Sequence, residues 1–366
     1  MRVTKQMLGN QTRKSILYLD QNFLSSAHRG GVEHEWTSVL MARVSVLLDL
    51  QLLAIPYSTT HVHESDLNGQ YRDKLVQFIQ KVSRGHRFEP YWRVEERQIL
   101  KAFQAFVEGA PPAHQKDERD ALSPSVHEWD EAYSVSVFSP ATGVDRRLLF
   151  KRQAIDDLVK ALPQWTTNAR TFEEDMNLEI SDAGRLLIES FTEKAARLVA
   201  GDFSALINAP ISASIGETLW YVAEAKKVDF SAIGAFLRSQ HFAEVPRVKL
   251  SARLFSAYKE GLRLSKTPLD PNSKKTREKL SGFFYDIEHA ATYAPYCDAY
   301  FTDNVMAKLM NSRRVRVEQD FGCKVFSAES KGDFLAWLKT LESSMTPEHA
   351  DDLSWAYPEK FPSQRN

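Results

Sequence analysis

Cysteine is scarce in this chain, and hydrophobic runs of membrane-spanning length are absent. The two cysteines, Cys297 and Cys323, cannot build a disulfide framework or a four-cysteine zinc site, which points to a reducing compartment. The longest apolar stretches lie near residues 50–60 and 203–216 and fall short of the roughly 18 apolar residues of a transmembrane helix. The basic N-terminal stretch is not followed by the apolar region of a signal peptide. We therefore expect a cytoplasmic protein that makes no membrane contact.

A strong net charge is also missing. The 366 residues include 47 Lys and Arg against 48 Asp and Glu, which gives a formal net charge of −1. The field of the whole protein therefore does not attract nucleic acid, and any such binding must come from a local basic face. With 43% hydrophobic residues the chain can bury a full core, which excludes disorder as its main state. The length allows two domains, or one domain with a large insertion.

The first 65 residues alternate between patterns typical of strands and of helices. Residues 15–19 form a continuous apolar run followed by Asp20, and this continuity predicts a strand buried on both faces of a parallel sheet. Residues 36–48 have the spacing of an amphipathic helix, and residues 50–55 have the apolar content of a second strand. The hydroxyl side chains of residues 58–60 can cap a further helix, which carries Glu64. Their order predicts a βαβ unit.

Helical periods dominate from about residue 71 to residue 280, and strand patterns return after them. The periods predict helices at residues 74–82, 94–107, 147–162, 184–199, 214–226, 230–237, 250–262, 283–293, 305–310 and 332–341, with strands at 298–304 and 322–327. Each terminal αβ piece is too small to fold alone, so we predict that the two share one parallel sheet flanked by helices. The predicted α/β domain comprises residues 1–68 and 281–345, the mostly helical insertion residues 69–280, and the C-terminal tail residues 346–366.

Acidic side chains follow two of the predicted strands. Asp20 ends the first strand and Asp303 ends the strand near residue 300. The carboxyl ends of parallel strands meet at one edge of a sheet, where open α/β sheets bind their ligands. Glu64 comes on the helix after the second strand, and Asp286 lies near the start of the predicted helix 283–293, on one face with His289. We therefore expect four carboxylates at one edge.

Carboxylates gathered in one cleft repel each other unless a cation neutralises them. Oxygen ligands favour Mg²⁺ or Mn²⁺, and such a site suits the hydrolysis of a phosphodiester by a metal-activated water. Taken singly, Asp20, Asp303 or Asp286 is more typical of a helix cap, and Glu64 of a solvated helix. The joint pattern is harder to explain by capping. Asn22, Thr302, Asn304 and His289 stand beside these acids and could bond a ligand carboxylate or a metal-bound water.

The motifs around these acids resemble the PIN-like nuclease family. They are Leu-Asp20-x-Asn22-Phe, Pro56 followed eight residues later by Glu64, Asp286-x-x-His-Ala-Ala, and Phe-Thr302-Asp303-Asn304. The resemblance covers under half the chain and implies a parallel sheet flanked by helices, with Asp20, Glu64, Asp286 and Asp303 binding Mg²⁺ or Mn²⁺ for RNA cleavage, sometimes DNA cleavage. Two features depart from the family pattern. Compact PIN domains lack the long helical insertion, and Asp298 could supplement or replace Asp286 as a ligand.

Basic residues near the predicted site could contact a nucleic acid backbone. These are Lys274, Lys275 and Arg277 before Asp286, and Arg313 and Arg314 after Asp303. Solvated loops are the usual explanation for such runs.

Other functions compete with an RNA nuclease. A degenerate PIN-like scaffold could be a non-catalytic interaction protein, and the same acids could cleave DNA or a small phosphate ester. The His61-x-His63 pair invites a zinc interpretation, but no further histidines follow in a matching context. A protein partner that regulates the activity is a further expectation from the resemblance.

Overall fold

A four-stranded parallel sheet forms the centre of the α/β part of the protein. The computed structural model describes residues 12–31, 35–59, 61, 72–113, 116–122, 125–130, 144–265 and 269–362. The strands are β1 (Ser15–Leu19), β2 (Leu53–Ala54), β3 (Ala299–Phe301) and β4 (Lys324–Phe326), in the spatial order β2-β1-β3-β4. All neighbouring pairs are parallel. The prediction of an α/β protein with a parallel sheet flanked by helices is confirmed.

The two ends of the chain build this sheet together, as the sequence predicted. Strands β1 and β2 come from the N-terminal part and β3 and β4 from the C-terminal part, and β1 pairs with β3 in the middle. From β1 the chain moves outward to β2, and from β3 it moves outward to β4 on the opposite side. The boundary between β1 and β3 is therefore the point at which the connections diverge, where open α/β sheets bind their ligands.

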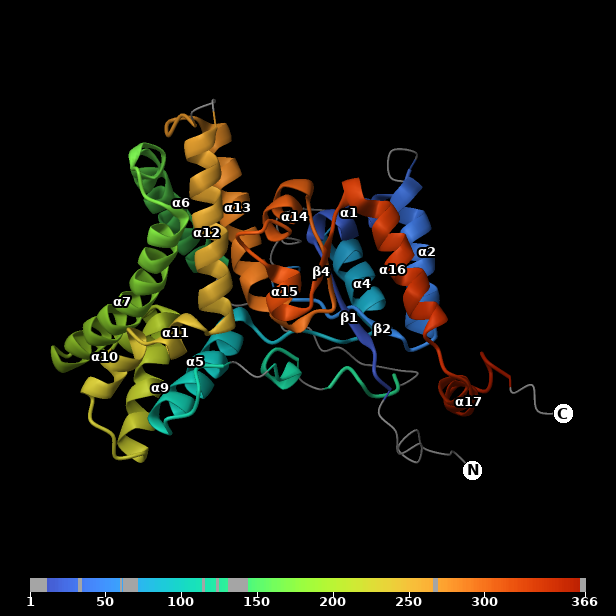
Figure 1. The fold of residues 1–366 in the computed structure, drawn as a ribbon, viewed down its shortest axis with the longest axis horizontal. Helices are drawn as coiled ribbons and strands as arrows, with labels where there is room; N and C mark the ends of the chain where they lie inside the picture. Colours follow the sequence, from blue (N-terminus) through green and yellow to red (C-terminus); the bar gives the residue numbers. More distant parts are fainter. Residues whose placement is uncertain are drawn as a thin grey trace.

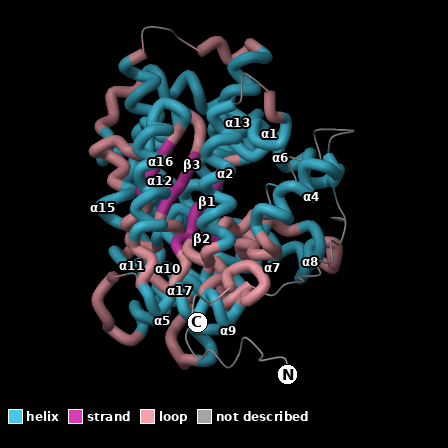
Figure 2. The backbone as a smooth tube through the Cα atoms, turned by 90° about the vertical axis from the view of Figure 1, so that its right-hand side faces the viewer, coloured by secondary structure: helices cyan, strands magenta, loops and turns pink. Residues whose placement is uncertain are grey.

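Helices cover both faces of the sheet because both faces are apolar. On one face, Leu17 and Leu19 of β1 pack with Phe301 of β3 and Phe326 of β4. The helices that complete this core are α1 (Gln21–Arg29), α2 (Glu35–Asp49), α4 (Arg72–Ser83) and α16 (Lys331–Ser343). Figure 1 shows α2 and α16 on this side of the strands, and Figure 2 looks onto it.

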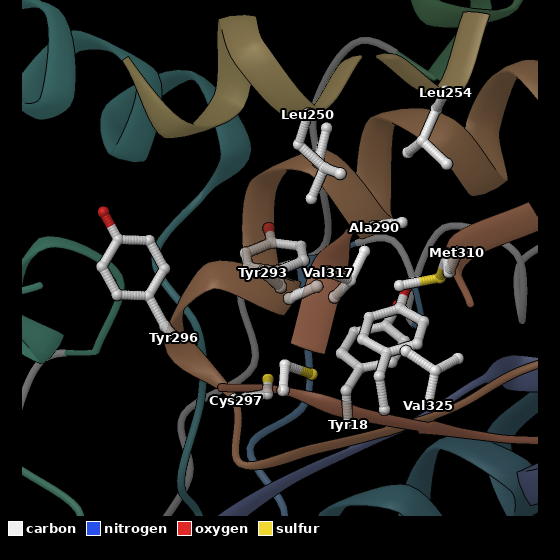
Figure 3. Close-up of a cluster of buried hydrophobic side chains, with 14 of the residues drawn as sticks. Tyr18, Leu250, Leu254, Ala290, Tyr293, Tyr296, Cys297, Met310, Val317 and Val325 are labelled. Carbon is white, nitrogen blue, oxygen red and sulfur yellow. The ribbon is translucent and has the colours of Figure 1, made fainter. Parts of the chain in front are cut away.

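The opposite face carries the alternate side chains of the same strands. Tyr18 and Val325 lie below Ala290 and Leu254 in Figure 3, and all four side chains are buried. The helices here are α12 (Pro246–Leu264), α13 (Lys274–Tyr293), α14 (Asn304–Met310) and α15 (Val317–Phe321). Short 3-10 turns follow α13 and β4, namely η5 (Ala294–Tyr296) and η6 (Ala328–Ser330).

Most of the remaining helices extend to one side of the sheet (Figure 1), where buried side chains from several of them form a separate core. They are α5 (Tyr91–Val107), α6 (Val144–Thr167), α7 (Phe172–Val199), α8 (Ala205–Asn208), α9 (Ile211–Ala225), α10 (Ser231–Leu237) and α11 (Gln240–Ala243), with a short turn η4 (Glu118–Asp120). Phe103 of α5, Leu219 of α9 and Phe236 of α10 are among its buried residues. No helix in the described part combines the length and apolar content needed to cross a bilayer.

The predicted helical insertion and the sheet share buried contacts. Leu75 and Ile79 of α4 pack in the same core as β1, and Leu250 and Leu254 of α12 pack over the other face. The predicted C-terminal tail contains a helix, α17 (Pro347–Ala356), that is fastened to the α/β part. His349 in this helix bonds the carbonyl oxygen of Leu50 through its Nε2, at 2.7 Å. The boundaries at residues 69, 280 and 346 remain predictions, but side-chain packing crosses them.

Candidate functional site at the carboxyl edge

Asp20 and Asp303 stand next to each other at the point where the chain connections diverge. Strands β1 and β3 pair in register, with Leu19 opposite Phe301. The backbone N–H of Asp20 continues this ladder by donating to the carbonyl oxygen of Phe301 at 2.9 Å. Each acid then begins the turn into a helix, Asp20 into α1 and Asp303 into α14. The strand register therefore places the two acids close to each other at this edge of the sheet.

Asp303 caps its helix. Its Oδ1 accepts hydrogen bonds from the backbone N–H groups of Val305, at 2.6 Å, and Met306, at 3.1 Å. Both bonds satisfy donors that a helix leaves free in its first turn. Capping, the competing explanation for this residue, is thus part of its role. It occupies one carboxylate oxygen and leaves Oδ2 without a hydrogen bond from the described residues.

Asp20 behaves differently from Asp303. It precedes α1 but makes no capping hydrogen bond with its side chain, which is half-buried and accepts a hydrogen bond from Asn22 Nδ2 at 3.4 Å. Burial raises the pKa of Asp20 to about 6, and the negative charge of Asp303 adds to this rise, while the N–H groups of Gln21 and Asn22 oppose it. A carboxylate with such a pKa gains from a nearby cation.

Asp286 approaches the same region from α13, which covers the sheet. The helix begins at Lys274, so Asp286 lies in its second half, which corrects the predicted position near the helix start. The Asp286 side chain is half-buried. Its charge and that of Asp20 both act on Tyr300, whose pKa is raised well above the ordinary value by burial, by Tyr18 and by these two acids. Tyr300 therefore lies within the electrostatic reach of both carboxylates. The sequence did not single it out.

The aromatic ring of Tyr300 is held firmly. It stacks on Tyr18 with ring centroids 4.4 Å apart and an interplanar angle of 5°. Both rings come from neighbouring strands and are almost fully buried. The parallel register places Tyr18 directly opposite Tyr300, which the sequence alone could not show.

The predicted neighbours of the acids have varied roles. Asn304 accepts a hydrogen bond from the backbone N–H of Glu329 at 3.2 Å, and so joins α14 to η6. Thr302 is buried, and its backbone N–H donates to the carbonyl oxygen of Phe326 at 3.0 Å. His289 is buried on α13. Asn22 bonds an acid of the site directly, through its side-chain amide to Asp20.

Asp298 lies at the opposite end of β3 from Asp303, which corrects its assignment as an alternative ligand. Its Oδ2 accepts a hydrogen bond from the backbone N–H of Ile16 at 2.8 Å. Asp303 follows Asp298 by five residues, a separation that spans about 16 Å along extended chain. Asp298 therefore fastens the amino ends of β1 and β3, and the structure does not bring it to the carboxyl edge.

The ring of His61 is held by contacts with the backbone, which indicates a structural role. Its Nε2 lies 2.8 Å from the carbonyl oxygen of Leu19, and its Nδ1 accepts from the backbone N–H of Ser58 at 2.9 Å. Burial lowers its pKa to about 4. Both ring nitrogens are thus engaged, which leaves none for zinc. His63 lies outside the described residues.

The predicted backbone-binding cations are partly engaged elsewhere. Arg314 forms ion pairs with Glu173 and Glu260, and Arg277 with Asp156. Lys274 is the first residue of α13, about 18 Å along the helix axis from Asp286. Lys275 and Arg313 are exposed. Phosphate contacts by Arg277 and Arg314 would compete with the acids that already bind them.

Glu64 falls in residues 62–71, outside the described residues. Within the described part of the chain, no group of three His, Cys, Asp or Glu side chains is arranged to hold a metal ion. The observed arrangement is therefore a pair of carboxylates at adjacent strand ends, with Asp286 nearby. Comparisons with protein-family models, with curated proteins and with solved structures find no match.

Proposed function

We propose that the carboxyl edge of the sheet is the active site of a metal-dependent phosphodiester hydrolase, with RNA as its first expected substrate. The observation that carries the proposal is the position of Asp20 and Asp303, which lie just after the carboxyl ends of the paired strands β1 and β3 and close enough for the charge of Asp303 to raise the pKa of Asp20. Asp20 is not consumed by capping, and its raised pKa indicates a neighbourhood that disfavours its negative charge. The resemblance of the surrounding motifs to PIN-like nucleases supports the same reaction.

The donor chemistry of this edge fits Mg²⁺ or Mn²⁺. Asp303 has Oδ2 available, and the Asp20 carboxylate is partly exposed beside it. Asp20 and Asp303 would hold the ion, with Asp286 and Glu64 as further carboxylates. When bound, the ion would lower the pKa of an attacking water and offset charge on the phosphate.

The residues of the chain have separate tasks in this proposal. The backbone bonds of Val305 and Met306 hold Asp303 in one orientation, so its free oxygen faces a constant direction. Asn22 keeps Asp20 oriented through its side-chain amide. Glu64 would orient the attacking water or bind the ion.

Cleavage of labelled RNA in the presence of Mn²⁺ tests the proposal. We expect Asp20→Asn and Asp303→Asn to lose at least about a hundredfold in rate, because each removes a charge that an ion needs. Asp298→Asn is the matched control, since it changes an acid at the other end of β3 and should retain activity. Wild-type rates in both edge variants would refute the assignment. Parallel assays with DNA and with small phosphate esters identify the substrate class.

A non-catalytic interaction protein is the second candidate. One observation favours it, namely an exposed apolar segment that runs from the end of α7 through α8. That segment comprises Val199, Phe203, Leu206 and Ile207, whose side chains are largely exposed. Calorimetry that detects no Mn²⁺ or Mg²⁺ binding at millimolar concentration would favour this candidate.

A further inference from the structure

Trp36 packs against the two chain segments that carry the acids of the carboxyl edge. It is the second residue of α2, and its ring stacks on Phe301 with centroids 6.2 Å apart and an interplanar angle of 27°. It also meets the ring of Phe23 edge-on, at 5.8 Å. Phe301 precedes Asp303 by two residues, and Phe23 follows Asp20 by three. The indole is therefore held in place by the same two chain segments that carry the acids.

Lys331 stands over the indole. It is the exposed first residue of α16, and its Nζ lies 5.9 Å from the centroid of the Trp36 ring. Among the described residues no carboxylate forms an ion pair with it. A lysine held by an aromatic ring keeps its charge available, because the contact is weak and the ammonium remains hydrated. Trp36 itself is half-buried, so part of the indole surface is accessible.

The charges around this pair limit what it can bind. Glu35 and Asp333 are in the first turns of α2 and α16, so the surface is not basic as a whole. A duplex backbone, which needs several cations, gains little here. An aromatic face with one cation instead suits a single unpaired nucleotide, whose base stacks while its phosphate meets the ammonium.

We propose that Trp36 and Lys331 form a binding subsite for an unpaired nucleotide, next to the acid pair. The base stacks on the indole of Trp36 and displaces Lys331 from the ring, and the ammonium then contacts the adjoining phosphate. This inference rests on the proposed function, since it supplies the hydrolase with a place for one nucleotide of a single-stranded substrate. It assigns the selection of single strands to two residues outside the acidic motifs.

Binding can be measured without hydrolysis in an Asp20→Asn parent with EDTA present. Fluorescence anisotropy of a labelled single-stranded RNA oligonucleotide gives the Kd, and a hairpin duplex of equal length is the comparison. We expect Trp36→Ala to weaken single-strand binding about tenfold, and Trp36→Phe to retain most of it because a phenyl ring still stacks. Lys331→Gln should weaken binding severalfold and reduce its salt dependence.

Matched controls are available in the same chain. Trp355→Ala removes an exposed tryptophan of α17, and Lys339→Gln removes an exposed lysine two turns along α16 from Lys331; neither should change the Kd. Unchanged binding in Trp36→Ala and Lys331→Gln would overturn the proposal, as would duplex binding as tight as single-strand binding, or no binding by the parent. If Trp36→Ala fails to fold, Lys331→Gln decides, because an exposed lysine is not needed for the core.

The proposed function and this subsite fail in different ways. If the wild type neither hydrolyses RNA nor binds Mn²⁺, but its oligonucleotide binding depends on Trp36, the hydrolase proposal is refuted and the subsite is retained. Hydrolysis that depends on Asp20 but is unchanged in Trp36→Ala and Lys331→Gln refutes the subsite alone.

Discussion

The backbone N–H of Asp20 donates to the carbonyl oxygen of Phe301 at 2.9 Å, which holds Asp20 beside the strand end that leads into Asp303. Asp20 follows β1 directly and Asp303 follows β3 after Thr302, so both acids lie just beyond the carboxyl ends of neighbouring parallel strands. Their roles differ, because Asp303 caps α14 while Asp20 makes no cap for α1. Asp303 therefore contributes to stability as a helix cap, whereas Asp20 affects stability through its unfavourable buried charge. Both effects can be measured.

Replacement of Asp20 by Asn should stabilise the metal-free protein at neutral pH. The folded-state pKa of about 6 lies above the ordinary value of 3.8, so the native state holds the proton more tightly than the unfolded chain does. The resulting penalty is absent below pH 4, grows as the pH rises through the folded pKa, and is complete above it. Its upper limit is about 3 kcal/mol, and partial exposure reduces it.

Urea unfolding of the wild type and Asp20→Asn in EDTA, at several pH values from 4 to about 7.5, measures this effect. The wild type should lose free energy of unfolding relative to the variant as the pH rises. Curves that run parallel over this range would show that Asp20 is not perturbed.

Two substitutions of Asp303 should separate capping from ion binding. Asparagine can accept the bonds from Val305 and Met306, whereas alanine cannot. We expect Asp303→Ala to lose about 1 kcal/mol of stability and Asp303→Asn to lose little. Both should abolish the rise in Tm that Mn²⁺ produces in the wild type. A full Mn²⁺ response in Asp303→Asn would exclude this carboxylate as a ligand.

The sequence predicted the strands and the edge because both depend on local patterns. Residues 16–19 are apolar without alternation, and the structure buries them on both faces of the sheet. The apolar period predicts a start for helix α7 that is twelve residues too late, although Thr171 and Glu174 form a capping box that signals its true beginning. The acidic first turn of this helix carries the same signal, because acids there interact favourably with the helix dipole.

The rest of the site depends on register and on distant contacts. The direction of β3 places Asp298 before the strand and Asp303 after it, but only the long-range hydrogen bond from the Ile16 N–H shows that Asp298 joins β3 to β1. Tyr300 meets the charges of Asp20 and Asp286 because three separate segments converge on it. Such pairings join residues far apart in the chain, and no local period reports them.

A buried ion pair fastens the amino end of the sheet. Lys14 Nζ lies 2.6 Å from Asp130 Oδ1, and the lysine side chain has no exposure to solvent. His86 Nε2 contacts the same oxygen at 2.9 Å. We expect Lys14→Met to cost about 3 kcal/mol, because it leaves the Asp130 charge buried with fewer partners. Chemical denaturation measures the loss, and a loss below about 1 kcal/mol would contradict the expected cost of an unpaired buried charge.

The same pair has a defined pH dependence. Burial alone would raise the pKa of Asp130, but hydrogen bonds from His86 and Lys14 outweigh it and hold the pKa below its ordinary range. Its stabilising contribution is therefore present above about pH 4 and is lost as the pH falls. Asp130→Asn should flatten the acid limb of the stability curve. An acid limb identical to that of the wild type would place the sensitive carboxylates elsewhere.

Close packing of α7 against α9 requires a glycine at position 216. A Cβ atom there would lie 2.7 Å from the Cβ of Phe191 and 3.0 Å from the carbonyl oxygen of Leu187. Alanine favours the helix by about 1 kcal/mol, but the overlap should cost more, so we expect Gly216→Ala to lose about 1–2 kcal/mol. Gly261→Ala in α12 is the control, because a Cβ there meets nothing within 4 Å and should stabilise the protein slightly. If the helices pack this closely, thermal unfolding should give a lower Tm for Gly216→Ala and a slightly higher Tm for Gly261→Ala. Equal gains in Tm would show that they do not.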